Sequence, residues 1–228
     1  MKKLVLVTGT DTGVGKTVVT CALLRALRQR GHHPVPIKPV ETGCTDLEQP
    51  EDALALSSAA GGIPLELVCP VRYRTPAAPA TAARLEGSAH SFEGVLDHVR
   101  RAQAAHPIVI LEGAGGLLVP LAEGKNYADL ALSLGSPILI VARNALGTIN
   151  HTSLTLEAAF SRGIPVLGVV LNAPAAPDAV FVDHCAELRA LWPGVPFMGP
   201  TSRMKNPQST TMSDEMSSMK IVDLIADT

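Results

Sequence analysis

Apolar residues fall into two alternating patterns along the chain: short continuous runs, and longer stretches with helical spacing. The short runs are rich in Val, Ile and Leu, which is typical of strands buried on both faces of a parallel sheet. They predict strands at residues 3–8, 34–39, 108–112, 137–142 and 166–172, and a weaker strand at 195–198. Strands that alternate with helices favour an α/β fold, in which a mainly parallel sheet is flanked by helices.

The stretches with helical spacing predict helices that lie between these strands. Their expected bounds are residues 16–30, 51–60, 92–105, 127–134, 148–162 and 178–191. Gly31 and Gly163 directly follow two of them, and glycine readily adopts the left-handed conformation that ends a helix. With 228 residues and no visible internal repeat, the chain is expected to form one domain over residues 1–228.

Two regions depart from this regular alternation. Residues 69–80 contain three prolines, which favours a loop or a short edge segment. Residues 201–218 are rich in Ser, Thr and Met and poor in bulky apolar residues, which predicts a mobile tail. A last helix is expected near residues 214–226. Its predicted packing residues are Met219, Val222 and Ile225.

A glycine-rich segment connects the first predicted strand to the first predicted helix. Five residues separate Gly9 from Gly15, one more than in the common phosphate-binding loop. Glycines let backbone N–H groups point at a polyphosphate, and the helix N-terminus adds its positive dipole. Lys16 would reach the β- and γ-phosphates, and the Thr17 hydroxyl would bind magnesium. Compared with an ordinary glycine turn, a nucleoside triphosphate site is the favoured interpretation.

Charged residues follow two other predicted strands. Glu112 ends a buried strand, and an acid at the C-terminal tip of such a strand faces the crevice where α/β folds bind ligands. It is a candidate carboxylate for the metal that accompanies a triphosphate. Lys38 would present a cation to the same crevice, although taken alone it is better interpreted as a solvated surface lysine.

Three further polar positions have both a structural and a functional interpretation. Asp52 lies in the first turn of a predicted helix, where an acid is commonly a cap or a dipole partner. Gly147 opens another helix, whose free N–H groups would suit a carboxylate. Asn172 ends a buried strand, where its amide could cap a turn or pair with a purine edge.

Composition and charge narrow the class of protein. The net charge of −2 gives no broad basic surface, which argues against a nucleic-acid partner. No uninterrupted apolar stretch is long enough to span a bilayer, and the N-terminal residues lack the pattern of a signal peptide, so a cytoplasmic protein is expected. The four cysteines are scattered, which predicts free thiols rather than a zinc site or a redox dithiol.

As an ordered set, these segments resemble the dethiobiotin synthetases, ATP-dependent enzymes of biotin synthesis. The shared segments read GTDTGVGKT, KPVETG, DALAL, EGAGGLLVPL, LGTINH and GVVLNAP, and they span most of residues 4–174. The phosphate loop and EGAGG occur in wider relatives, whereas KPVETG together with GTINH is much more specific. The extra residue in the loop also belongs to this family. The resemblance implies a three-layer P-loop NTPase-like fold and a homodimer.

The resemblance also implies roles for individual residues. The ATP site would comprise Gly13, Val14, Gly15, Lys16, Thr17, Glu112 and Asn172, with Asn172 contacting adenine. The magnesium ligands would be Thr17, Asp52 and Glu112. The substrate 7,8-diaminononanoate would lie near Thr12, Lys38, Thr42 and Gly115. Its distant carboxylate would meet Gly147, Thr148 and Asn150 of the partner subunit.

The implied chemistry joins CO2, supplied as bicarbonate, to the diamine. One amine captures CO2 as a carbamate, whose negative charge Lys16 and Lys38 would hold as catalytic residues. A carbamate oxygen then attacks the γ-phosphorus of ATP, and the neighbouring amine closes a cyclic urea with release of phosphate. The second amine belongs to the same molecule, so positioning should supply much of the rate.

Three features of the sequence depart from the family pattern. Gly13 stands where some relatives carry Glu, and Glu41 adds a negative charge that either faces a substrate amine or points away. Residues 198–202 only loosely fit the family segment that helps to hold adenine.

Three alternative functions use a similar phosphate loop. A cobyrinic acid amidase-type synthetase usually carries a glutaminase domain, for which this chain has no room. A nucleotide-switched partitioning ATPase often has a second lysine early in the loop, where residues 10–12 are Thr-Asp-Thr. A small-molecule kinase would lack the pairing of KPVETG with GTINH.

Overall fold

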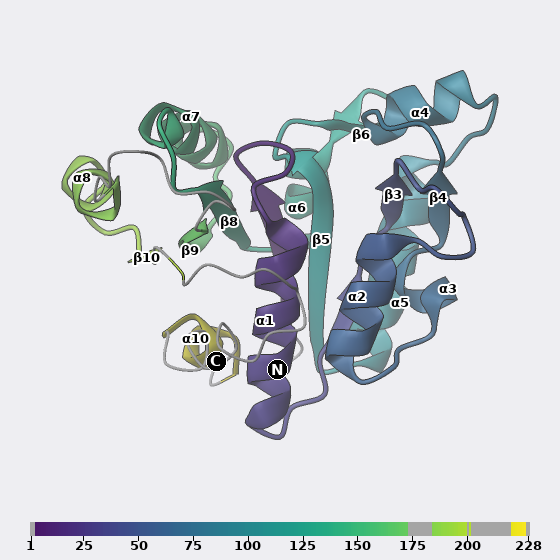
Figure 1. The fold of residues 1–228 in the computed structure, drawn as a ribbon, viewed down its shortest axis with the longest axis horizontal. Coiled ribbons are helices and arrows are strands. Elements are labelled where there is room, and N and C mark those ends of the chain that lie inside the picture. The colour runs from purple at the N-terminus through teal and green to yellow at the C-terminus, as the bar shows by residue number, and fades with distance from the viewer. Residues whose placement is uncertain (1–2, 173–183, 200, 202–219, 227–228) are drawn as a thin grey trace.

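A parallel sheet of six strands forms the centre of the molecule (Figure 1). The computed structural model describes residues 3–172, 184–199, 201 and 220–226. The strand order is β10-β9-β8-β1-β5-β2, and every neighbouring pair runs parallel. The strands are β1 (Lys3–Gly9), β2 (Val35–Ile37), β5 (Ile108–Gly116), β8 (Ile138–Arg143), β9 (Val166–Asn172) and β10 (Phe197–Met198).

Successive residues of a central strand pack into different cores. In β1, Leu4 and Leu6 belong to one apolar cluster, whereas Val5 and Val7 belong to another. This follows from the two-residue period of a strand, which turns neighbouring side chains to opposite faces. Both faces of the sheet are therefore covered, which explains the continuous apolar runs in the sequence.

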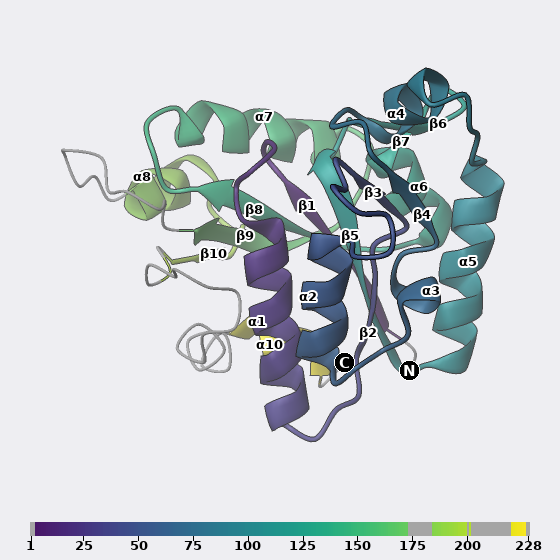
Figure 2. The same cartoon turned by 45° about the vertical axis from the view of Figure 1, so that its right-hand side comes forward.

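Helices cover the two faces and complete three layers (Figures 1 and 2). One core includes residues of α1 (Lys16–Gln29), α2 (Glu51–Ala60) and α10 (Lys220–Ala226). The other includes residues of α5 (Phe92–Ala105), α6 (Tyr127–Leu134), α7 (Thr148–Phe160) and α8 (His184–Leu191). Within the described part of the chain, no helix has both the length and the apolar character needed to cross a membrane.

Several short elements lie outside the main sheet, and all except β4 were not predicted. They are β3 (Val40–Thr42), α3 (Leu65–Val68), β4 (Val71–Tyr73), α4 (Pro79–Leu85), β6 (Pro120–Ala122) and β7 (Lys125–Asn126). The predicted loop or short edge segment at residues 69–80 is confirmed by β4, a three-residue strand that pairs with β3, except that α4 already begins at Pro79. Proline suits the first turn of a helix, where its missing N–H leaves no bond unmade.

The regular elements agree closely with the sequence pattern. All six predicted strands are present; β5 runs on to Gly116, and β2 is limited to Val35–Ile37. The helix predicted at 178–191 is described only as α8, and its first residues lie outside the described part. Residues 202–218 of the predicted tail also lie outside it, and so does Met219, a predicted packing residue of the last helix.

The last helix confirms two of its predicted packing positions. Val222 and Ile225 are buried within the core that α1 shares, as their spacing indicated. Gly31 and Gly163 have φ values of 83° and 70°, as expected for residues that end a helix.

Candidate active site

A pocket of about 420 Å³ lies at the C-terminal edge of the sheet, where the loop after β1 meets α2, β3 and the end of β5. Parallel strands end together at this edge, and ligands of open α/β sheets bind there. Most of the predicted phosphate, metal and substrate residues line it. They are Thr12, Gly13, Gly15, Lys16, Thr17, Lys38, Thr42, Asp52 and Gly115.

The phosphate loop has the backbone geometry of an anion cradle. Gly13 and Gly15 have φ values of 70° and 93°, which side chains other than glycine rarely adopt. A Cβ atom on Gly15 would lie 2.1 Å from Nδ2 of Asn172, so the residue also has no room for a side chain. Gly15 is the N-cap of α1 and supplies no side-chain acceptor, which leaves the first-turn N–H groups available to an anion.

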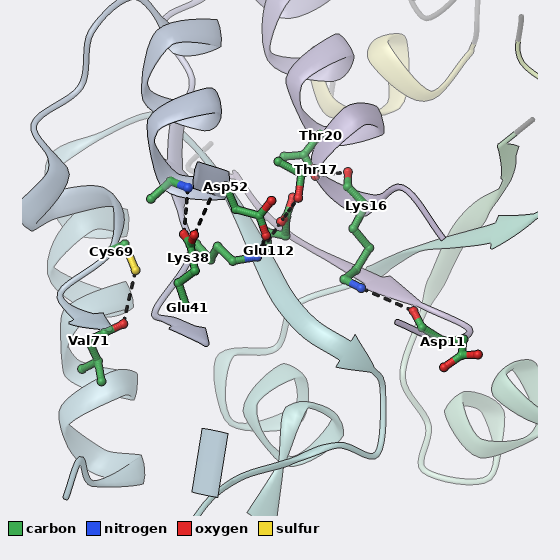
Figure 3. Close-up of polar contacts among 11 residues, drawn as sticks. Asp11, Lys16, Thr17, Thr20, Lys38, Glu41, Asp52, Cys69, Val71 and Glu112 are labelled. Atoms are coloured by element: carbon green, nitrogen blue, oxygen red, sulfur yellow. Dashed lines mark hydrogen bonds and ion pairs between the residues drawn. The ribbon is translucent and has the colours of Figure 1, made fainter. Parts of the chain in front are cut away.

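Lys16 leaves the first turn of α1 and extends along this loop (Figure 3). Its Nζ donates to the backbone oxygen of Asp11 at 3.4 Å. Burial lowers the pKa of Lys16; Glu112 opposes that effect, and the nearby Lys38 adds to it. One long hydrogen bond to a neutral acceptor thus holds the ammonium group beside the loop. A phosphate oxygen could replace that acceptor.

A charge cluster around the buried Lys38 lies at the other side of the pocket (Figure 3). Nζ of Lys38 lies 2.7 Å from Oδ2 of Asp52 and 2.9 Å from Oε1 of Glu112. The same oxygen of Glu112 accepts a hydrogen bond of 2.9 Å from the Thr17 hydroxyl. Four separate segments of the chain therefore bring their functional groups to one point.

Lys38 is the residue whose interpretation from sequence alone was wrong. It is only 4% exposed, rather than a solvated surface lysine. Burial acts to lower its pKa, but the carboxylates of Glu112 and Asp52 outweigh burial and raise the pKa well above the ordinary value. Lys38 is therefore a permanent cation between two acids.

The oxygen atoms of this cluster fit a magnesium ion. Oε2 of Glu112 is buried and, among the described residues, has no hydrogen-bond partner. It therefore has a free lone pair next to the Thr17 hydroxyl and the Asp52 carboxylate. Magnesium prefers a few carboxylate and hydroxyl oxygens, with phosphate and water oxygens completing its octahedron. The donor set is thus of the right kind for a metal that arrives with a nucleotide.

Glu41, whose role the sequence left open, does not line the pocket and is directed at the start of α2. Its carboxylate accepts hydrogen bonds from the backbone N–H groups of Asp52 at 3.0 Å and Ala53 at 2.8 Å. It is 5% exposed, and burial raises its pKa despite the nearby Lys38. Glu41 is therefore the cap of α2, a role that the sequence had considered for Asp52. No local pattern could reveal this, since the cap and the helix belong to separate elements.

Asn172 connects the phosphate loop to a distant segment. Its Nδ2 donates to the backbone oxygen of Val14 at 2.9 Å, and its Oδ1 accepts from the Thr201 hydroxyl at 3.1 Å. The amide therefore has a structural role, although it joins two distant segments rather than capping a local turn. One amide hydrogen and one lone pair stay available for a base, so the predicted adenine contact remains a prediction.

The helix start predicted to bind a carboxylate lies outside the main pocket. Gly147 is the N-cap of α7, with a φ of 92° and no side-chain acceptor. Thr148 lines a separate small pocket with Asp11 and Arg143, and Asn150 is exposed. Gly147, Thr148 and Asn150 are therefore absent from the lining of the main pocket, although Thr148 shares its small pocket with Val14 of the phosphate loop.

A second, more apolar pocket of about 370 Å³ lies beside α7. Leu118 and Leu154 line it and keep 46% and 57% of their surfaces exposed. Large exposed apolar side chains that gather around a hollow are typical of an interaction surface.

Several proteins with similar sequences are described as ATP-dependent dethiobiotin synthetases. An ATP-dependent dethiobiotin synthetase from Anaeromyxobacter dehalogenans is 51% identical, over 81% of this chain and 83% of that protein. One from Bacillus licheniformis is 37% identical, over 90% of this chain and 87% of that protein. Residues 3–205 also match the family described as AAA domain.

Solved structures with a similar fold are more distant in sequence. A cell division ATPase MinD from Pyrococcus furiosus has a TM-score of 0.56 at 19% identity, covering 99% of this chain and 100% of that one. A ParA family ATPase from Chlorobium tepidum has a TM-score of 0.55 at 14% identity, covering 99% of both chains. At these identities the likeness defines the P-loop ATPase fold alone. The similarity in sequence is what identifies the family, and the chain belongs to the ATP-dependent dethiobiotin synthetases.

Proposed function

We propose that this protein forms dethiobiotin from 7,8-diaminononanoate and CO2, using ATP and magnesium. The observation that carries the proposal is Lys38, held between Asp52 and Glu112 in the pocket that the phosphate loop opens. A buried cation beside a triphosphate site suits a reaction that joins two anions, a phosphoryl group and a carbamate. Membership of the family supplies the identity of the substrate.

The phosphates of ATP would contact the backbone of residues 13–17 and the ammonium group of Lys16. To reach them, Lys16 would exchange its 3.4 Å hydrogen bond to Asp11 for a phosphate oxygen. The residues that would hold magnesium are Thr17, Asp52 and Glu112. A magnesium ion bound there supplies positive charge to the phosphoryl oxygens during transfer.

The diamine would lie between the phosphate loop and β3, near Thr12, Thr42 and Gly115. One amine forms a C–N bond to CO2 and loses a proton, which leaves a carbamate anion. Lys38 would hold that anion, and it already contacts two carboxylate groups in the same position. The chain's own contribution to this step is orientation and a fixed charge.

Two displacements would complete the reaction. An oxygen of the carbamate attacks the γ-phosphorus, and ADP leaves with the electrons of the broken P–O bond. The second amine then attacks the carbonyl carbon of the mixed anhydride and loses a proton, and phosphate leaves. Lys16 and Lys38 would balance the charge at both stages, and the ring closure is intramolecular.

We also propose a cytoplasmic homodimer, in which the carboxylate of the substrate meets Gly147, Thr148 and Asn150 of a partner subunit. These residues do not line the main pocket of their own chain. The uncapped start of α7 is suited to an anion, and the exposed leucines beside that helix are suited to a partner surface.

A nucleotide-switched ATPase is the main alternative, because MinD and ParA have the same fold. Their sequence identity to this chain is too low to argue for function, whereas the synthetases reach 51%. The test is to incubate the protein with ATP, magnesium, the diamine and 13C-labelled bicarbonate. Mass spectrometry should find a cyclic urea that carries one label, with one ADP for each product. Steady ADP release without the diamine, and no urea with it, would overturn the proposal.

A further inference from the structure

The helix that carries Asp52 is capped by a side chain from another element. The N-cap position of α2 is Pro50, which supplies no side-chain acceptor. The carboxylate of Glu41, which belongs to β3, takes its place and accepts the N–H groups of Asp52 and Ala53 (Figure 3). The two oxygens make one bond each, so both act in the cap.

This cap determines what the carboxylate of Asp52 can do. An aspartate in the first turn of a helix ordinarily satisfies free N–H groups of that turn. Here Glu41 already occupies those N–H groups, and Asp52 instead directs its carboxylate to Lys38 at 2.7 Å. The side chain of Asp52 is thereby available to the pocket that it lines.

The same contact connects the segment from Lys38 to Thr42 with the start of α2. Glu41 lies in the segment between Lys38 and Thr42, and both of these residues line the pocket. Its side chain is 5% exposed, so it has little freedom to take another position. A buried carboxylate is costly unless it is hydrogen-bonded, and its two charge-assisted bonds therefore place it firmly against α2.

We propose that Glu41 is a positioning residue of the metal–nucleotide site, which holds the Asp52 carboxylate toward Thr17 and Glu112. This inference rests on the proposed function in one respect, the assignment of Asp52 as a magnesium ligand. Removal of Glu41 leaves two N–H groups without their acceptor, and the Asp52 side chain, which belongs to the same turn, can turn back to them. Magnesium binding should weaken as a result.

The experiment measures how much magnesium strengthens binding of a fluorescent ADP analogue to the full-length protein. Each titration is done with excess EDTA and again with excess Mg2+, and the ratio of the two affinities is the magnesium-dependent gain. Glu41→Ala should lower this gain about tenfold or more. The affinity in EDTA should stay unchanged, because it depends on the phosphate loop. Glu41→Gln, whose amide oxygen can accept one of the two bonds, should lie between.

A double-mutant cycle separates positioning from a general effect. Asp52→Asn should lower the gain by itself, and adding Glu41→Ala should lower it no further, because both changes remove the same ligand. A wild-type gain in Glu41→Ala overturns the inference. Losses that add in the double variant also overturn it, since Glu41 would then act through another group. If Glu41→Ala does not fold, Glu41→Gln with Asp52→Asn forms the cycle.

Ser91 offers a matched control, since its hydroxyl caps α5 by accepting the N–H of Gly94 at 3.0 Å. Ser91→Ala should lower the melting temperature and leave the magnesium-dependent gain unchanged. The titrations contain no diamine, so they are independent of the reaction. Failure to form the cyclic urea would contradict the proposed function and leave the Glu41 inference standing. An unchanged gain in Asp52→Asn would remove the metal assignment from both.

Discussion

Two helix N-termini form opposite walls of the pocket, and they use the same chemical feature in different ways. Helix α1 begins after Gly15, with no side-chain cap, so its first N–H groups are available to a ligand. Helix α2 begins after Pro50, and two of its N–H groups are bonded to the buried carboxylate of Glu41. The first terminus is suited to binding, whereas the second is a fixed support for a side chain.

The two helix N-termini contribute different kinds of chemical groups to the site. The α1 wall would recognise phosphate with backbone groups, which glycines expose and which need no particular side chain beyond Lys16 and Thr17. The α2 wall acts through side chains, and the fold must bring Lys38, Asp52 and Glu112 together for it. Substitutions on the first wall should therefore affect nucleotide binding, and those on the second should affect metal and carbamate chemistry together with stability.

The largest effect is expected on the α1 wall, from Lys16→Ala. This substitution removes the cation that would follow the transferred phosphoryl group, and kcat for cyclic urea formation should fall by about 10^3-fold or more. Steady-state ADP release in the presence of the diamine measures the loss. Cys21→Ala, a fully buried position on the same helix, is the control and should keep most of the activity. Comparable turnover in the Lys16 variant would contradict the phosphate assignment.

On the α2 wall, Lys38→Met should lower both activity and stability. The carbamate would lose its counter-ion, which should reduce kcat by about 10^2-fold. Glu112 is fully buried and would lose its cation, which should lower the free energy of unfolding by about 3 kcal/mol. Arg30→Met is the control, since it removes an ion pair with Asp223 that is far more exposed and should change stability by about 0.5 kcal/mol or less. Equal losses in denaturant unfolding would contradict the distinction.

A pair of glycine substitutions tests the α1 wall without changing its charge. Gly15 and Gly147 have φ values of 93° and 92°, so alanine at either position should cost about 1 kcal/mol of backbone strain. Only at Gly15 would the new Cβ collide with the Asn172 amide, at 2.1 Å; at Gly147 the nearest atom is 3.8 Å away. Breaking the bond from Asn172 to Val14 should cost about 1 kcal/mol more.

Nucleotide binding should respond in the same order. Gly15→Ala should lose affinity for ADP, because the N–H groups at the start of α1 would face the phosphates, whereas Gly147→Ala should keep it. Isothermal titration with ADP measures both variants. An equal loss of affinity would show that backbone strain, rather than closure of the phosphate cradle, determines the effect.

The sequence predicted the α1 wall almost completely, because that wall is local. Strand, glycine turn, Lys16, Thr17 and helix follow one another within one segment, and their order defines the geometry. The main sheet was predicted for a similar reason, since long buried runs of Val, Ile and Leu are distinct from helical spacing. Short elements such as β3 and α4 were missed because a run of three to seven residues carries too little of either pattern.

For the α2 wall, the sequence predicted the residues but not the contacts between them. Glu112 and Asp52 were candidates by position, but burial of Lys38 depends on two acids that lie 14 and 74 residues away in sequence. The cap by Glu41 depends on how β3 lies against the start of α2. Such contacts come from the packing of separate elements, which no local spacing encodes.

The smallest expected effect is a dependence of stability on pH that comes from His90, a residue outside both walls. Without this assignment, the dependence would be attributed to the charged α2 wall. Nε2 of His90 lies 2.9 Å from the backbone oxygen of Leu121, which can only accept, so Nε2 donates. Nδ1 of the neutral ring then accepts from the Tyr73 hydroxyl, at 2.8 Å. Burial lowers the pKa of His90, although the bond to Leu121 and the charge of Glu123 oppose it.

The folded protein therefore binds the His90 proton less readily than the unfolded chain does. The stability that His90 contributes is present above the ordinary pKa of 6.5 and is lost as the pH falls through the lowered value. His90→Gln should cost about 1 kcal/mol at about pH 7.5 and less at about pH 5.5, as measured by denaturant unfolding. Tyr73→Phe removes the donor to Nδ1 and should also make stability less dependent on pH. If both variants kept the wild-type pH dependence, His90 would not be its source, and the assignment would be wrong.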